Sequence, residues 1–263
     1  AFASIYEGRY LAGIAAGMKL NARLEAGEIT TPKMGYIGAF TYAEVISGLT
    51  SFYLGAKSVC ENVVMDVTFT GSWYDENAEK QAAIALREQH GCELISQHAD
   101  SMGAPSACEE LGVPNVSYNG STQASCPKTY IVSSRINWAP YFEYIIDCVQ
   151  NGKEIAVDWC GGIAEGSVVL TAINTAVAAP GTQDAIDAAI DQFKAGTPHV
   201  FDCNNFTVGG QKITSYMADV DSDPDFTADT EVVENGVFYE SKFRSAPYFD
   251  LRIDGINFLD EKY

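Results

Sequence analysis

Residues 62–90 read NVVMDVTFTGSWYDENAEKQAAIALREQH, and this stretch decides the fold. Its first part, 62–70, is rich in β-branched and apolar residues, which is typical of a strand. From residue 76 onward acidic residues come first and basic ones later, which matches the dipole of a helix. The stretch therefore predicts a strand–loop–helix unit. Its loop carries two adjacent aromatic residues, Trp73 and Tyr74, at a place where loops are usually polar.

The same alternation continues on both sides of this unit. The strict order of strands and helices over residues 34–120 predicts an α/β fold, a doubly wound parallel sheet with right-handed crossovers. The further strands expected are 34–40, 92–99, 114–120 and 129–138, with two short strands around a glycine pair in 154–173. The further helices expected are 4–26, 43–59, 103–112, 139–152 and 182–196. From residue 199 we expect hairpin-like pieces such as 206–216.

Composition restricts the partners of the chain. Its 263 residues include 35 acidic and 16 basic ones, a formal charge of −19. That charge repels phosphate backbones and anionic membrane surfaces, so we expect no nucleic-acid partner. No stretch approaches the roughly 18 uninterrupted apolar residues of a membrane span. The seven cysteines are scattered without a CxxC pair, which predicts buried reduced thiols rather than a zinc site or a disulfide framework.

The chemistry of a doubly wound sheet is expected beyond the carboxyl ends of its strands. Aromatic, carboxylate and amide side chains recur there. After successive strands come Phe40, Thr41, Tyr42 and Glu44; Ser72, Trp73, Tyr74 and Asp75; Gln97, His98, Asp100 and Ser101; Tyr118, Asn119 and Ser121; and Asn137, Trp138 and Tyr141. This mixture suits a planar ring system, because aromatic residues supply contact area while polar groups fix orientation. The sequence therefore predicts a ligand pocket at this edge.

Catalytic and metal-binding alternatives find less support. His98 and Asp100 are a candidate acid–base pair, but the chain has no G-x-S-x-G elbow, no P-loop and no G-x-G-x-x-G. One histidine and one carboxylate are too few ligands for zinc. The acidic stretch 219–232 lacks the glycine and the closing glutamate of an EF-hand loop. We therefore expect no catalytic residue, no metal and no cofactor, with His98 as a hydrogen-bonding group of the pocket or core.

Several ordered motifs carry a family resemblance: IYEGRYLAGIAAGM (5–18), YIGAFTYAEVISGLTSFYLGAKSV (36–59), FTGSWYDENAEKQAA (69–83), ISQHADS (95–101), VSYNGS (116–121) and INWAPYF (136–142). Together they resemble the basic-membrane-protein (BMP, PnrA-like) family, the substrate-binding lipoproteins of bacterial ABC importers for purine nucleosides and bases. The resemblance implies a two-lobed periplasmic-binding-protein type I fold, with the ligand enclosed between the lobes. It also implies an ABC permease as partner, an extracytoplasmic location, and a lipid anchor through a segment that this chain does not contain.

The resemblance further implies how the chain divides. Residues 34–135 would form the complete second lobe, while 1–33 and 136–263 would supply first-lobe elements, hinge crossovers and the tail. The family normally has a βαβαβ portion before the helix that contains YEGRYLAG, so we expect a first lobe truncated at its N-terminus. Exposed apolar faces would then favour a homo-oligomer. The family lysine that follows a carboxylate–Gly pair is missing after Glu165-Gly166, so we expect no lysine contact to a ribose there.

The predicted ligand-binding residues are Phe40, Glu44, Trp73, Asp100, Asn119, Trp138 and Gly162. Trp73 would stack on the base, Asp100 and Asn119 would exchange hydrogen bonds with it or with a ribose, and Gly162 would allow a close backbone approach. The predicted function is capture of a purine nucleoside or base for ABC import, without catalysis. Two alternatives stay open: a truncated family member acting through protein contacts or signalling, and a nucleoside-processing hydrolase using His98 and Asp100.

Overall fold

A computed structural model of the chain describes residues 1–197, 199–221 and 223–261. Its centre is a seven-stranded sheet with the order β13-β3-β2-β4-β5-β6-β8. The strands are β2 (Lys33–Gly38), β3 (Val64–Phe69), β4 (Leu94–His98), β5 (Asn115–Tyr118), β6 (Tyr130–Ile136), β8 (Val168–Leu170) and β13 (Ile256–Phe258). All neighbours run parallel except β8, which pairs antiparallel with β6. The predicted α/β fold with a parallel sheet is confirmed.

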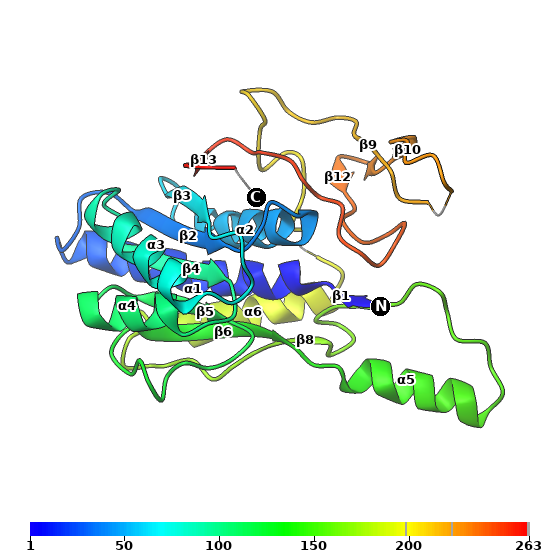
Figure 1. Ribbon diagram of the computed structural model, residues 1–263, viewed down its shortest axis with the longest axis horizontal. Coiled ribbons are helices and arrows are strands. Elements are labelled where there is room, and N and C mark those ends of the chain that lie inside the picture. The colour runs from blue at the N-terminus through cyan, green and yellow to red at the C-terminus, as the bar shows by residue number, and fades with distance from the viewer. Residues whose placement is uncertain (198, 222, 262–263) are drawn as a thin grey trace.

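Helices cover both faces of this sheet (Figure 1). The helices α1 (Ile5–Glu25) and α2 (Ala43–Lys57) pack on each other, and α1 also contacts β6 and α6 (Thr182–Lys194). The helices α3 (Glu76–Glu88) and α4 (Gly103–Leu111) pack together around a separate apolar core. Successive side chains of a strand point to opposite faces of the sheet, which explains why there are two cores. Tyr36 belongs to the larger core, while Ile37 belongs to the core under α3 and α4.

Glycines set the distance between α1 and α2. A Cβ atom on Gly13 would lie 2.1 Å from the carbonyl oxygen of Phe52, and one on Gly55 would lie 2.0 Å from that of Tyr10. Two helix backbones can approach this closely only when no side chain intervenes. The small residues that recur at helical spacing in 5–26 are therefore the contact surface of α1.

The helix α1 precedes β2 in the chain and packs against the same sheet as the segments that follow β2. The resemblance places 1–33 in the first lobe, and α1 packs on α2 and β6 of the seven-stranded sheet. Only the short strand β1 (Phe2–Ala3) pairs elsewhere, parallel with β7 (Cys160–Gly161). The lobe boundaries at 34–135 stay a prediction.

The C-terminal part of the chain has little regular structure. It contains the short pairs β9 (Met217–Ala218) with β10 (Thr230–Glu231), and β11 (Val233–Glu234) with β12 (Val237–Phe238). The hairpin expected at 206–216 is reduced to one isolated bridge between Val208 and Gln211. The chain then returns to the sheet as β13, which extends it beside β3, a pairing that the sequence analysis did not foresee.

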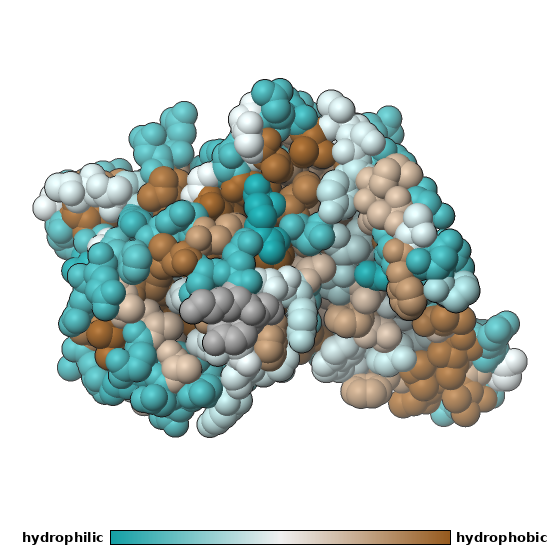
Figure 2. All heavy atoms as spheres, turned by 45° about the horizontal axis from the view of Figure 1, so that its top comes forward, coloured by the Kyte–Doolittle hydropathy of each residue, from teal (hydrophilic) through white to brown (hydrophobic). Residues whose placement is uncertain are grey.

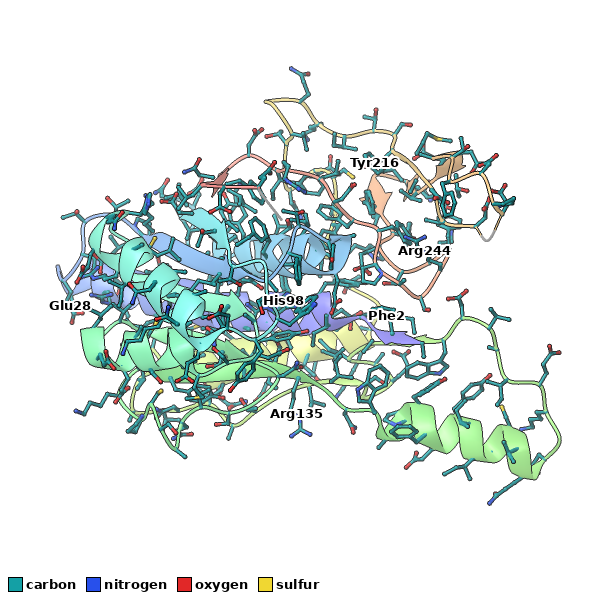
Figure 3. All side chains as sticks on the ribbon, viewed as in Figure 1. Phe2, Glu28, His98, Arg135, Tyr216 and Arg244 are labelled. Atoms are coloured by element: carbon teal, nitrogen blue, oxygen red, sulfur yellow. The ribbon has the colours of Figure 1, made fainter. Side chains whose placement is uncertain are left out.

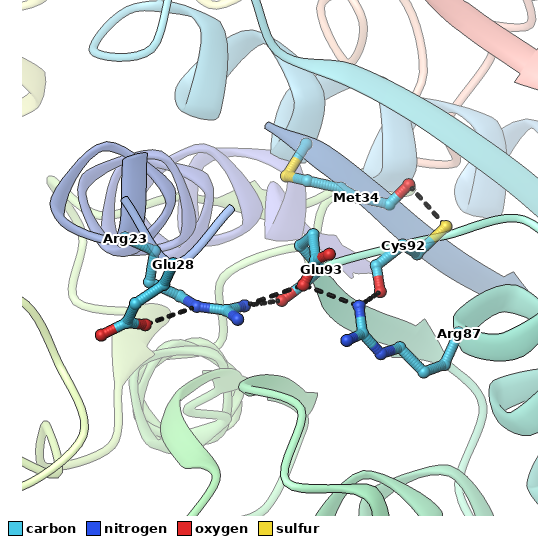
Figure 4. A network of polar contacts seen from close by, with 6 residues as sticks. All are labelled: Arg23, Glu28, Met34, Arg87, Cys92 and Glu93. Atoms are coloured by element: carbon cyan, nitrogen blue, oxygen red, sulfur yellow. Dashed lines mark hydrogen bonds and ion pairs between the residues drawn. The ribbon is translucent and has the colours of Figure 1, made fainter. Parts of the chain in front are cut away.

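The amino end of the sheet is held by paired charges (Figure 4). Glu93, just before β4, binds two guanidinium groups: its Oε2 lies 3.2 Å from Arg23 Nη1 and 2.6 Å from Arg87 Nη1. Arg23 also pairs with Glu28 at 3.1 Å. The Cys92 thiol donates a hydrogen bond to the carbonyl of Met34, at 3.4 Å. On the neighbouring strands, Lys33 Nζ lies 2.6 Å from Asp66 Oδ2, and that carboxylate is 4% exposed.

The helix α5 (Ala139–Gln150) projects from the body of the molecule (Figure 1). It presents an apolar stripe to the surface, in which Phe142 is 58%, Ile146 53% and Val149 69% exposed. Figure 2 shows this stripe as a brown patch at the lower right. Within the described part of the chain, none of the helices is both long and apolar enough to cross a bilayer. All seven cysteines are free thiols.

Candidate functional site

Five rings gather where the carboxyl ends of four strands meet, and we call them the aromatic cluster: Phe40, Tyr42, Trp73, His98 and Tyr118. Phe40 and Tyr42 stack at 4.9 Å, and the Phe40 ring meets Trp73 edge-on at 5.6 Å. His98 lies 6.2 Å from Trp73 and 4.2 Å from Tyr118. The rings follow or end β2, β3, β4 and β5, which lie side by side, so the parallel topology brings them together. Phe40 and Trp73 are half-buried, which leaves ring surface available to a ligand.

The loop that carries Trp73 is fixed at several points. Gly71 adopts a positive φ of 73°, which turns the chain sharply after β3. The backbone N–H of Asp100 donates to the carbonyl oxygen of Trp73 at 2.8 Å. Asp75 caps α3 by accepting from the N–H of Ala78 at 2.9 Å. The indole is therefore held in place by neighbouring loops as well as by ring contacts.

A buried arginine lies under the aromatic cluster. The guanidinium of Arg9 is fully buried, and it donates to Ser96 Oγ at 2.6 Å, to the Tyr36 hydroxyl at 3.1 Å and to the Ser117 carbonyl at 3.2 Å. Its carbon Cζ lies 5.7 Å from the ring centre of Tyr118, within cation–π range. In the part of the chain that the structure describes, no carboxylate pairs with Arg9. Its polar contacts join β2, β4 and β5.

An acidic cavity of about 310 Å³ opens beside the start of α1, between the 160–165 loop and residues Phe193, Gly196, 199–201 and 237–242. Glu7 accepts the N–H of Ile163 at 2.6 Å, and Glu240 accepts the hydroxyl of Ser47 at 2.7 Å. Burial raises the pKa of both carboxyl groups to about 7. These side chains can offer either a proton or a lone pair to a ligand near neutral pH.

Gly162 lies where this cavity is tightest. A Cβ atom at this position would lie 2.4 Å from Oε2 of Glu7, so a side chain would displace that carboxyl group. The N–H of Gly162 donates to Glu165 Oε2 at 2.8 Å. The close approach at Gly162 is to the carboxyl group of Glu7, and the predicted approach of its backbone to a ligand stays a prediction.

The first two turns of α2 join the cavity to the aromatic cluster. Glu44 Oε1 lies 3.9 Å from Nε2 of His98, and Ser47, three residues later, holds Glu240. Figure 3 shows His98 in the middle of the body, surrounded by side chains of several elements. Burial lowers the pKa of His98, and the nearby Arg9 charge acts in the same direction. The imidazole is thus held neutral.

The structure brings together part of the predicted set. Phe40 and Trp73 are in contact, Glu44 faces His98 of the same cluster, and the backbone of Asp100 bonds to that of Trp73. Asn119 has a left-handed backbone, φ 59°, and an exposed side chain directly after Tyr118. Trp138 starts α5, and its ring packs 6.1 Å from that of Tyr141 rather than on the cluster. Ligand contacts of all seven residues stay a prediction.

Two carboxylates of the site escaped the sequence analysis. Glu7 sits inside a helix motif and reads as an exposed helical position. Glu240 comes from the irregular C-terminal part, 193 residues from the Ser47 hydroxyl that it accepts. No local pattern indicates such a pairing. Among the described residues, no group of three or more His, Cys, Asp or Glu side chains is placed to hold a metal ion.

Comparison with known proteins places these features in context. The sequence model of the family described as "ABC transporter substrate-binding protein PnrA-like" matches residues 2–194. The putative ABC transporter glucose-binding protein TsgA13 of Haloferax volcanii is 31% identical over 166 residues, 63% of this chain and 40% of that protein. The purine-binding protein BAB2_0673 of Brucella abortus is 32% identical over 166 residues, 63% of this chain and 45% of that protein. The chain thus aligns with less than half the length of either relative.

Solved structures share the fold at low identity. A solute-binding protein of an ABC transporter system from Aeropyrum pernix K1 has a TM-score of 0.62 at 16% identity, covering 73% of this chain and 63% of that one. A corresponding protein from Conexibacter woesei DSM 14684 has a TM-score of 0.59 at 20% identity, covering 74% and 64%. These neighbours confirm the predicted periplasmic-binding-protein type I fold class.

Proposed function

The chain belongs to the PnrA-like family of ABC transporter substrate-binding proteins, and from this we propose that it captures a purine nucleoside or base for an ABC importer. Membership in a family of substrate-binding proteins favours binding over catalysis. The observation that carries the ligand proposal is the half-buried indole of Trp73, set against Phe40 and beside His98 at the carboxyl end of the sheet.

The geometry supports a flat ligand. A base that stacks on an aromatic side chain gains roughly 1–3 kcal/mol. Glu44, Asp100 and Asn119 supply acceptors and donors around the rings, which would fix the orientation of a heterocycle. Stacking together with a few hydrogen bonds is consistent with micromolar affinity, about −8 kcal/mol.

A hexose is the second candidate, and the acidic cavity favours it. Carboxyl groups such as Glu7 and Glu240 accept hydrogen bonds from sugar hydroxyls, and the cavity of about 310 Å³ has room for a small polar ligand. One relative is named for glucose and the other for purine.

Calorimetry and thermal unfolding with adenosine, inosine, adenine, uridine and glucose test the proposal. A ligand that binds only the folded state raises the melting temperature by mass action. We expect saturable binding of at least one purine, and weaker or no binding of uridine. Binding of glucose alone would favour the second candidate, and no response to any of the five would leave the protein-contact alternative.

The cellular setting follows from the same proposal. The chain would act outside the cytoplasm, with an ABC permease as partner and a lipid anchor in a segment outside 1–263. We also propose the lobe division at 34–135 and a homo-oligomer, with the exposed stripe on α5 as the contact surface. Light scattering of the purified chain measures its mass. A monomer at all concentrations would contradict the oligomer.

A further inference from the structure

One nitrogen of His98 has no hydrogen-bond partner within the described part of the chain. The side chain is 0% exposed, and Nε2 is the atom left without a partner. Glu44 Oε1 lies 3.9 Å from Nε2, which is too long for a hydrogen bond. Buried polar atoms are nearly always paired, and leaving one unpaired costs free energy. An unpaired nitrogen inside the aromatic cluster therefore calls for an explanation.

The contacts of the other ring nitrogen, Nδ1, indicate which tautomer of the His98 imidazole is favoured. His98 Nδ1 faces the Tyr36 hydroxyl at 3.5 Å, and that hydroxyl oxygen accepts from Arg9 Nη2 at 3.1 Å. Arginine can only donate, so the proton of the Tyr36 hydroxyl is free to point at Nδ1. Nδ1 is then an acceptor. Gly48 makes room for this edge of the ring, because a Cβ atom there would lie 2.8 Å from Nδ1.

The surroundings of Nε2 lead to the same tautomer. If Nδ1 carried the proton, the lone pair of Nε2 would face the Glu44 carboxylate, and the two would repel each other. With the proton on Nε2, the N–H points toward that carboxylate. Burial lowers the pKa of His98 against the opposing effect of Glu44, which favours the neutral ring, and a neutral imidazole carries its proton on one of the two nitrogens.

We infer that His98 is a specificity-determining residue, whose Nε2–H donates to an acceptor atom on the edge of a planar ligand. The inference rests on the proposed function and narrows its ligand class to heterocycles with an unprotonated ring nitrogen or a carbonyl oxygen. The imidazole lies 4.2 Å from Tyr118 and 6.2 Å from Trp73, among the rings on which such a ligand would stack. Glu44 is 32% exposed, so its carboxylate can turn toward solvent and leave its place opposite Nε2 to the ligand.

The tautomer is measured without any ligand. Long-range ¹H–¹⁵N spectra distinguish a protonated from an unprotonated imidazole nitrogen, and the His90→Gln/His199→Gln variant leaves His98 as the single histidine of three. At pH 7 we expect a proton on Nε2 and a bare Nδ1. A proton on Nδ1 overturns the inference.

Binding of purine analogues tests the contact itself. In His98→Gln the side-chain amide nitrogen reaches the place of Nε2, and in His98→Asn it reaches the place of Nδ1. We expect His98→Gln to bind adenosine within about 10-fold of the parent chain, and His98→Asn to bind about 10- to 100-fold more weakly. Melting temperatures of the free variants separate loss of binding from loss of folding.

Analogues that lack one acceptor identify the partner atom. Among 1-deaza-, 3-deaza- and 7-deazaadenosine we expect one to bind the parent chain at least about 10-fold more weakly than adenosine, with no such difference in His98→Asn. Equal binding of all three, with adenosine still bound, overturns the inference and leaves the proposed function standing. If no purine binds the parent chain, the proposed function fails and the inference fails with it.

Discussion

The two ends of the central sheet are built on opposite principles. At the amino end each charge has a partner: Glu93 binds Arg23 and Arg87, and Lys33 binds Asp66. At the carboxyl end the half-buried carboxyl group of Glu7 accepts from an N–H group and the buried one of Glu240 accepts from a hydroxyl group, and neither forms an ion pair among the described residues.

This difference separates stability from binding. Paired charges hold strands together and offer nothing to a ligand. Unpaired buried carboxyl groups and half-buried rings weaken the free protein, and a ligand that satisfies them recovers that free energy on binding. Substitutions at the amino end should therefore change the free energy of unfolding, and substitutions at the carboxyl end should change affinity.

The largest effect is expected from Asp66→Ala at the amino end. Its carboxylate is 2.6 Å from Lys33 Nζ and accepts from Asn257 Nδ2 at 3.1 Å. Asp66 is buried while the side chain of Lys33 is 26% exposed, so urea unfolding should show a loss at the low end for a buried ion pair, about 3 kcal/mol. Ligand affinity should not change. In the double variant Asp66→Ala/Lys33→Met part of the lost stability should return. If Asp66→Ala lowered ligand affinity as much as stability, the contrast between the two ends of the sheet would be wrong.

Glu240→Gln tests the carboxyl end through pH. The pKa of about 7 in the folded chain exceeds the ordinary value of 4.5, so the folded state binds this proton more tightly than the unfolded state does. Its contribution to stability is present below about pH 4.5 and is lost as pH rises to 7, up to about 3 kcal/mol in all. The variant should therefore be more stable than the parent chain at pH 8, and this gain in stability should be smaller at pH 5.

Urea unfolding at these two pH values measures the Glu240 effect. The matched control is Glu165→Gln, which alters an exposed carboxylate of the same cavity. It should leave the unfolding free energy nearly unchanged at both pH values. If the unfolding free energy of Glu240→Gln equals that of the parent chain at both pH values, then ionisation of this carboxyl group does not destabilise the folded state.

Trp73→Ala should weaken purine binding by about 10- to 100-fold, because the base loses its stacking partner, roughly 1–3 kcal/mol. The indole is half-buried, so the substitution should change the free energy of unfolding less than it changes the free energy of ligand binding. Tyr74→Ala is the control, since the neighbouring side chain is 66% exposed. Calorimetry on both variants decides: equal losses would mean that the loop as a whole matters, and not the indole.

The smallest effect is expected from Arg87→Gln. Both partners of its pair with Glu93 are partly exposed, at 33% and 20%, and such pairs contribute less than about 1 kcal/mol. The difference in thermal stability from the parent chain should shrink further in high salt, because exposed charges are screened. A larger, salt-independent loss would mean that the network of Glu93 acts as a buried unit.

Local patterns were sufficient to predict the helices and most of the strands of the sheet. The strand–loop–helix unit of residues 62–90 appears as β3 and α3, and Asp75 caps the helix. Parallel topology then places Phe40 beside Trp73, because their strands are neighbours. These inferences rest on periodicity and on chain order, which a single sequence displays.

What could not be predicted depends on contacts between distant segments. Glu240 reaches Ser47 across the fold, and β13 pairs with β3 although nothing in its own residues indicates a strand. Trp138 is predicted to line the pocket because it follows a strand; it is the N-cap residue of the projecting helix α5, its ring lies 6.1 Å from that of Tyr141, and its ligand contact stays a prediction. Position after a strand does not decide the direction that a side chain takes.

The strand β13 also has a consequence for how the chain is made. Asn257 meets Asp66 across 191 residues, so during synthesis one side of β3 stays unpaired until residues 256–258 have also left the ribosome. Exposed strand borders recruit other chains. Because residues 256–258 are synthesised late, the nascent protein is vulnerable to aggregation. Deletion of these three residues should therefore strongly lower the soluble yield on expression and have a smaller effect on the refolding rate of dilute, purified chain.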